Sequence, residues 1–185
     1  MSYSNSENMI LSAMRLVESN ENSNIRLNAN GGNCILLVCK PIQEFDYICS
    51  IKKLMAEDKY EIIDLNDLLC KFIKENQANI EESFKLLKGS LNQIFKHPAT
   101  EEGNDLFSLI LNAIGCSLKA KKIPILINIG SLYGTGIGSI HIMENEMVMR
   151  AELPLIILYP ATWEQDKLMF LGKRPASKYR CIIVG

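Results

Sequence analysis

The chain has 185 residues, of which 48% are hydrophobic and 22% are charged, as is typical of a globular domain. This length predicts a single domain, residues 1–185, that is large enough to bury an apolar core. The 20 basic and 21 acidic residues give a net charge of −1, which argues against a broad basic surface for nucleic acid.

The first half of the chain alternates between helical and extended patterns. Apolar residues at helical spacing predict a helix in residues 6–19 with Ser6 as its N-cap, and the Asn-rich stretch 20–33 predicts a loop. Residues 33–40 form a continuous apolar run, which is typical of a strand buried on both faces. The same reasoning predicts a strand in residues 60–67 and helices in residues 42–58, 67–76 and 80–96, followed by a loop at 97–104.

The second half continues the alternation and indicates the fold class. An apolar helix is expected in residues 105–122, a strand in 125–130, and a helix in 139–152 with Ser139 as its cap. Further strands are expected in residues 154–160, 167–173 and 179–185, the last two forming an antiparallel edge. The prediction is an α/β three-layer sandwich with a mostly parallel central sheet, helices on both faces and antiparallel C-terminal edge strands.

Cysteine usage and the chain termini indicate a reducing setting. The six cysteines include no C-x-x-C pair, and the two histidines, His97 and His141, do not fall at metal-ligand spacing. The N-terminal residues are polar and do not match a signal peptide, and no apolar run approaches the ~18 residues that a membrane span needs. We therefore expect a cytoplasmic protein with free thiols, no metal and no membrane partner.

A glycine-rich loop follows the predicted strand at 125–130. Its candidate anion-binding residues are Gly130, Ser131, Gly134, Gly136, Gly138 and Ser139. A phosphate-binding P-loop needs a lysine after its last glycine, and no lysine lies between Gly130 and His141. The dinucleotide pattern G-x-G-x-x-G fails as well, because its third position falls on Ser139 or His141. Backbone amides could still form an anion nest, but the pattern favours a tight turn whose glycines supply positive φ and close packing.

Three other side chains have a functional and a structural interpretation each. His141 could act as a base on a ligand at the loop, although a partly buried helical residue is favoured. Asp64 ends a strand, where it could hold a metal or, as we favour, bind neighbouring backbone amides. Trp163 could be a contact hot spot, but packing against Tyr159 or Phe170 is favoured. No catalytic set of residues can be recognised.

One local basic stretch lies near the C-terminus. Its candidate nucleic-acid contacts are Lys173, Arg174, Lys178 and Arg180. Because the chain as a whole is nearly neutral, a solvated surface loop is the favoured interpretation of these charges.

The order of these pieces resembles a known family. The segments "CILLVCKPIQEF", "IPILINIGSLYG" and "LYPATWEQDKLMFLG" look like the BrxB family, a small component of BREX phage-defence systems. The resemblance covers residues 33–184 as a family-like core and leaves residues 1–32 outside as an N-terminal helix and loop. Its landmarks are the loop Gly130–Gly134 and the C-terminal hairpin with Pro160 and Trp163.

The resemblance implies a P-loop-NTPase-like fold without the Walker A motif and a non-enzymatic role as an interaction subunit. The expected partners are other defence proteins, such as an alkaline-phosphatase-like or ATPase component, with nucleic acid reached only through the complex. No cofactor is expected. The alternative hypothesis is a nucleotide- or phosphate-binding protein that uses the Gly-rich loop 130–138.

Overall fold

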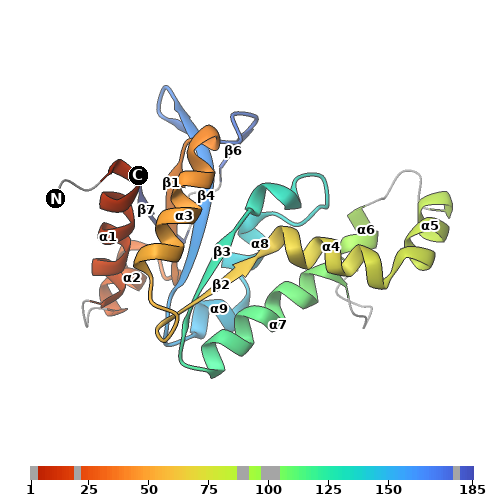
Figure 1. Cartoon of the computed structure of the whole chain (residues 1–185), viewed down its shortest axis with the longest axis horizontal. Coiled ribbons are helices and arrows are strands. Elements are labelled where there is room, and N and C mark those ends of the chain that lie inside the picture. The colour runs from red at the N-terminus through yellow and green to blue at the C-terminus, as the bar shows by residue number, and fades with distance from the viewer. Residues whose placement is uncertain (1–3, 19–21, 87–91, 97–104, 177–179) are drawn as a thin grey trace.

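The central feature of the molecule is a parallel β-sheet, in which the carboxyl ends of the parallel strands lie at one edge (Figure 1). A computed structural model describes residues 4–18, 22–86, 92–96, 105–176 and 180–185. Five parallel strands have the order β2-β3-β4-β1-β7. Their bounds are β1 Cys34–Cys39, β2 Tyr60–Asp64, β3 Ile123–Ile127, β4 Leu155–Glu164 and β7 Cys181–Val184.

Strand β1 is an interior strand of this sheet and lies between β4 and β7. Its register pairs Cys34 with Leu155 and Cys39 with Pro160, and all six of its residues are buried. Because successive side chains point to opposite faces, Cys34, Leu36 and Val38 join one core cluster, and the alternate residues join the other. The continuous apolar run therefore marks a strand covered on both faces, as the sequence predicts.

Helices cover both faces of the sheet, which confirms the predicted α/β sandwich. One face carries α1 Asn5–Glu18, α2 Asn22–Asn28 and α3 Glu44–Leu54, the last preceded by the 3-10 turn η1 Pro41–Gln43. The other face carries α4 Leu65–Glu75, α7 Leu106–Lys119, the 3-10 turn η2 Ile129–Leu132, α8 Ser139–Met143 and α9 Glu146–Arg150. From α4, helix α5 Gln77–Leu86 extends away from the sheet, with α6 Asn92–Phe95 beside this arm (Figure 1).

Two short strands continue the sheet in antiparallel fashion. After Pro160, β4 runs on as one arm of a hairpin with β5 Lys167–Phe170, and β6 Arg174–Pro175 pairs with β5. The antiparallel part of the prediction thus applies to β5 and β6. The last strand, β7, does not pair with β5 but runs parallel to β1 at the sheet edge.

Several predicted boundaries were wrong for local reasons. Residues 22–28, expected as loop, form α2, because Ile25 buries completely against the sheet. Helix α1 begins one residue before Ser6 with a capping box: the Ser4 hydroxyl accepts from Glu7 N, and Glu7 accepts from Ser4 N. The predicted 80–96 helix corresponds to α5 and α6, and residues 87–91 and the predicted loop 97–104 lie outside the described residues.

The helix expected in residues 139–152 is interrupted. Asn145 stands between α8 and α9, and its side-chain oxygen accepts a hydrogen bond of 3.0 Å from Met147 N. That bond caps α9 and starts a new helix at a point where apolar periodicity continues unchanged. Ser139 is the first residue of α8 rather than its cap, which is Gly138.

Asn33, directly before β1, holds the segment that leads into β4. Its buried Nδ2 lies 2.8 Å from Ala151 O, 3.0 Å from Leu153 O and 3.3 Å from Val148 O. One amide group thus contacts carbonyls of α9 and of the segment between α9 and β4, where Arg26 also donates to Ala151 O.

We predict that Asn33→Asp destabilises the fold by at least about 3 kcal/mol, because a carboxylate would face carbonyl oxygens with no hydrogen to donate. Chemical denaturation at neutral pH measures this loss. Asn112→Asp makes the same chemical change at an exposed position of α7 and serves as the control. An equal response of the two variants would contradict the role given to Asn33.

Candidate functional site

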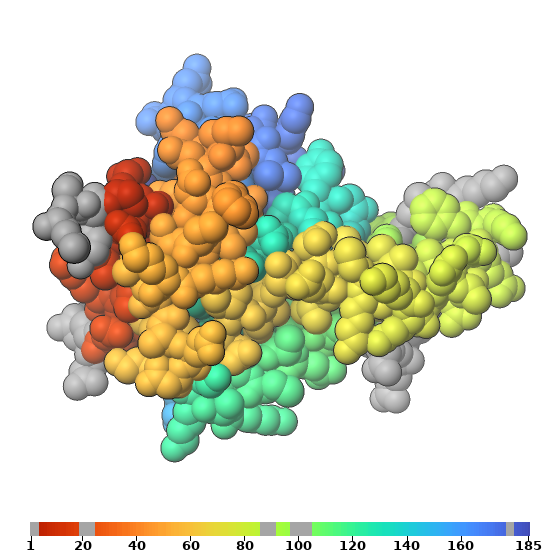
Figure 2. All heavy atoms as spheres, in the orientation of Figure 1, coloured from red at the N-terminus to blue at the C-terminus, as the bar shows by residue number. Residues whose placement is uncertain are grey.

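A cavity of about 300 Å³ opens beneath the Gly-rich loop, at the carboxyl ends of β3 and β4. In sheets of this kind, ligands bind in crevices outside the carboxyl ends of the strands. The loop lies beside the segment that carries β6 (Figure 2). The cavity is lined by Ile129, Leu132, Tyr133, Gly134, Gly136, Ile137, Gly138, Ser139, Ile140, His141, Tyr159, Phe170, Arg174 and Pro175.

Asn128 anchors the start of the loop. It adopts the left-handed conformation, with φ of 56°, directly after β3 ends, and its Nδ2 donates to Asp64 Oδ2 over 2.8 Å. The other Asp64 oxygen accepts from Asn66 N and Asp67 N and thereby caps α4. This confirms that Asp64 binds backbone amides. Asn128 was not among the residues predicted from the sequence, although Asn is among the few side chains that tolerate this backbone conformation.

The loop satisfies many of its own amides. Thr135, buried at 5% exposure, donates its hydroxyl to Leu132 O and accepts from Ile137 N. Backbone bonds also run from Thr135 N to Leu132 O and from Tyr133 N to Gly130 O. In an anion nest such amides would point at the ligand. Because these amides bind within the loop, the geometry favours a structural turn over a phosphate cradle.

Two of the four glycines are required by the backbone itself. Gly134 and Gly136 have φ of 91° and 79°, a region that side chains with a Cβ rarely adopt. At Gly136 an added Cβ would also lie 2.6 Å from Asn92 Cβ on α6, whereas the space around Gly134 is open. Gly130 and Gly138 have no positive φ, so their glycines are not needed for this reason. Gly130 and Ser131 also do not line the cavity.

The polar groups of the cavity come from α8 and β4. Ser139 is a hydrogen-bond partner of the Tyr159 hydroxyl, and burial raises the pKa of Tyr159, so the phenol stays protonated at neutral pH. His141 Nδ1 accepts from Gly138 N over 3.0 Å, which ties the imidazole to the loop. Burial lowers the pKa of His141, and Lys96 lowers it further while Glu144 opposes the change.

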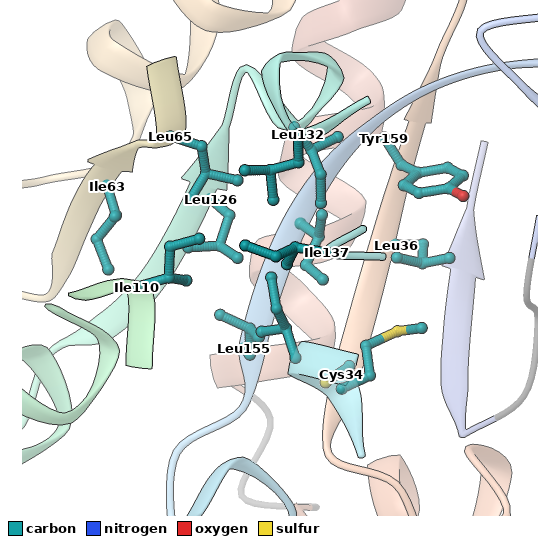
Figure 3. Close-up of a cluster of buried hydrophobic side chains, with 14 of the residues drawn as sticks. Cys34, Leu36, Ile63, Leu65, Ile110, Leu126, Leu132, Ile137, Leu155 and Tyr159 are labelled. Carbon is teal, nitrogen blue, oxygen red and sulfur yellow. The ribbon is translucent and has the colours of Figure 1, made fainter. Parts of the chain in front are cut away.

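Apolar side chains from the loop form the cavity floor and join the core cluster of this face. Figure 3 shows Leu132 and Ile137 packed among sheet side chains such as Leu126 and Leu36. The Tyr159 and Phe170 rings lie 4.9 Å apart and close the cavity on the side of the hairpin.

The basic residues singled out near the C-terminus do not act together. The Arg174 guanidinium lies over the Tyr133 ring, 4.6 Å from its centroid, at the cavity rim. Arg180 instead faces α8 and α9, where it lies 3.8 Å from Glu144 and 3.8 Å from Met149 Sδ. Lys173 is exposed and Lys178 lies outside the described residues. Arg174 and Arg180 therefore contact different elements and do not share a described stripe.

A second exposed region lies at the same edge of the sheet, beyond the end of β1. Ile42 is 89% exposed, Phe45 74% and Trp163 49%, all large apolar side chains. Turn η1 packs against β4, and Trp163 lines a hollow together with Lys40, Gln43 and Tyr47. We call Ile42, Phe45 and Trp163 the edge surface. Trp163 is half-exposed, which is compatible with a contact role, while its predicted packing against Tyr159 or Phe170 stays a prediction.

Glu44 lies behind the edge surface, in the first turn of α3. Its Oε1 is buried and has no hydrogen-bond partner among the described residues. Burial raises the pKa of this carboxyl, and the negative charge of Asp64 raises it further. Neighbouring Cys39 is a buried thiol whose pKa burial raises to about 12, so it is not an activated nucleophile.

The rest of the described chain offers no metal site. No group of three or more His, Cys, Asp or Glu side chains could hold an ion there, and the six cysteines are free thiols. Cys116 is exposed on the outer side of α7. Among the described helices, none has the length and apolar character to cross a membrane.

Comparison with known proteins gives no relative. No protein-family model matches the sequence, no curated protein matches it, and no solved structure matches the fold. The functional argument therefore depends on the cavity and the edge surface themselves.

We predict that Gly134→Ala costs about 1–2 kcal/mol of stability, the penalty of a left-handed backbone, and that Gly136→Ala costs more because of Asn92. Gly130→Ala is the matched control, since its Cβ would make an ordinary contact of 3.6 Å with Leu171. Thermal unfolding of the three variants measures the order of their stability losses. A cost at Gly130 equal to that at Gly136 would contradict this account.

A second prediction concerns pH. An acid whose pKa is raised by folding holds its proton longer in the folded state, so stability falls as pH rises from the ordinary Glu value through the raised one. Glu44→Gln should therefore raise the melting temperature at pH 7 by about 2–4 °C and leave it nearly unchanged below the ordinary value. Asp46→Asn, an exposed change in the same helical turn, should bring no such gain. A Glu44→Gln effect independent of pH would overturn the assignment.

Proposed function

We propose that this chain is a non-enzymatic interaction component of a bacterial or archaeal phage-defence assembly of the BREX type. In this proposal it acts in the cytoplasm and binds other defence proteins, with an alkaline-phosphatase-like or ATPase component as the partner. The observation that carries the proposal is the edge surface, three large apolar side chains exposed on adjoining elements.

The edge surface has the composition of a protein contact. Trp is among the residue types that dominate binding energy at interfaces, and Ile42 and Phe45 project from the first turns after β1 with most of their surface in solvent. Exposed apolar groups that gather at one place mark interaction sites more often than scattered ones do. Because the edge surface lies at the carboxyl ends of the strands, a partner can bind there without displacing the helices that cover the two faces of the sheet.

Two further arguments support an interaction role over catalysis. The loop has neither the P-loop lysine nor the dinucleotide spacing, and its amides bind within the loop. The resemblance to the BrxB family adds the defence context and the class of partner. Two of the candidate basic side chains, Arg174 and Arg180, contact different elements, which supports reaching nucleic acid only through a partner.

The test is co-expression with the products of the neighbouring genes, followed by affinity purification and measurement of the binding constant. We predict that Ile42→Asp and Trp163→Ala each weaken capture at least tenfold, as expected when a hot-spot side chain is lost. Leu27→Ser removes an equally exposed apolar side chain, 76% exposed, from α2 and should leave capture unchanged. Failure to capture any neighbouring product, or equal loss in all three variants, would overturn the proposal.

A further inference from the structure

The cavity beneath the Gly-rich loop has the build of a small-molecule site. Its volume of about 300 Å³ stands at the lower end of the range of about 300–1,000 Å³ found for such sites. Its walls are apolar and aromatic, with Tyr159 and Phe170 on one side and Leu132 and Ile137 on another. A volume of this size admits one flat ring system, with the charged group of the ligand at the rim where Arg174 lies.

Polar side chains from α8 and β4 also line that space. Ser139 and Tyr159 bring two hydroxyls to the cavity wall. Because Gly138 N donates to His141 Nδ1, the proton of the neutral imidazole resides on Nε2, which is then a hydrogen-bond donor. Two hydroxyls and one N–H donor suit a ligand that carries oxygen acceptors.

The charge of the cavity is positive. No Asp or Glu of the described chain lines it, whereas the Arg174 guanidinium lies at its rim over Tyr133. None of the described carboxylates pairs with Arg174, so its forked donors are available. Lys96 is close enough to His141 to act on its protonation, and Glu144, the acid on that side, lies 3.8 Å from Arg180.

The groups that bind an anion here differ from those of a phosphate-binding loop. The loop amides of Tyr133, Thr135 and Ile137 bind inside the loop, so they cannot cradle a charged group. Recognition of charge then falls to a side chain on β6, a strand that reaches the loop from a different part of the chain.

We propose that this cavity binds a small planar aromatic anion, with the ring between the loop and the Tyr159–Phe170 pair and the charged group on Arg174. A nucleoside monophosphate and an aromatic carboxylate share this chemistry. The inference goes beyond the interaction role and does not depend on it, because the cavity and the edge surface have no lining residue in common.

The test titrates the purified full chain with adenosine 5′-monophosphate and with 4-hydroxybenzoate, by calorimetry and by amide chemical shifts. We expect one of the two compounds to bind, with amide shifts at Gly134, Ser139 and His141. The compound that binds shows whether the charged group of the ligand is a phosphate or a carboxylate. Adenosine alone supplies the ring and inorganic phosphate the charge, and each half should bind at least tenfold more weakly than the whole.

Arg174→Gln should weaken binding about tenfold or more, the effect of losing a charge-assisted hydrogen bond. Its fold should be intact because Arg174 is exposed, and the melting temperature checks this. Lys173→Gln, which removes the same charge from the adjacent exposed position outside the cavity, is the matched control and should bind as the wild type does. Absence of binding by both compounds at millimolar concentration, shifts elsewhere, or equal effects of the two variants would overturn the proposal.

Discussion

The burial of β1 on both of its faces is the constraint on which the rest of the structure depends. A strand with six buried residues needs neighbours on both edges and helices above and below, since each exposed apolar side chain would cost free energy. Strands β4 and β7 supply the edges, while α1 and α3 cover one face and the loop–α8–α9 segment covers part of the other. With the interior committed to apolar packing, polar chemistry remains possible at the carboxyl edge.

That edge is divided by the hairpin of β4 and β5. On one side, Tyr159 and Phe170 face the loop and form a wall of the cavity. Farther along the same hairpin, Trp163 lines a hollow together with Lys40 and Gln43 of the turn after β1. The two features are thus built on a single hairpin that continues the central strand β4. Because β4 pairs with β1 up to Pro160 and with β3 up to Ile157, the hairpin extends from a strand that is held in the sheet.

The sequence predicts the strands that are buried along their whole length. It does not predict helix boundaries that depend on a single side chain. The buried strands follow from apolar runs, and the turn role of Gly134 and Gly136 follows from the failure of both phosphate fingerprints. The α8–α9 break depends on the single Asn145 cap, and α2 depends on burial of Ile25 in a stretch whose composition is that of a loop. Such effects arise from local hydrogen bonds and tertiary contacts, which periodicity does not measure.

The candidate site was the least predictable part, because its residues come from distant segments. The loop could be located from its glycines, and His141 and Ser139 lie near it in sequence. Arg174 was considered with Lys173, Lys178 and Arg180 as a nucleic-acid contact, since neighbours in sequence suggest a shared surface. The pairing of β6 with β5 separates Arg174 from Arg180 and places its guanidinium over Tyr133. The pairing of β6 with β5, which composition does not reveal, therefore makes Arg174 part of the cavity. The backbone conformation of Gly134 and Gly136 shapes the opposite wall.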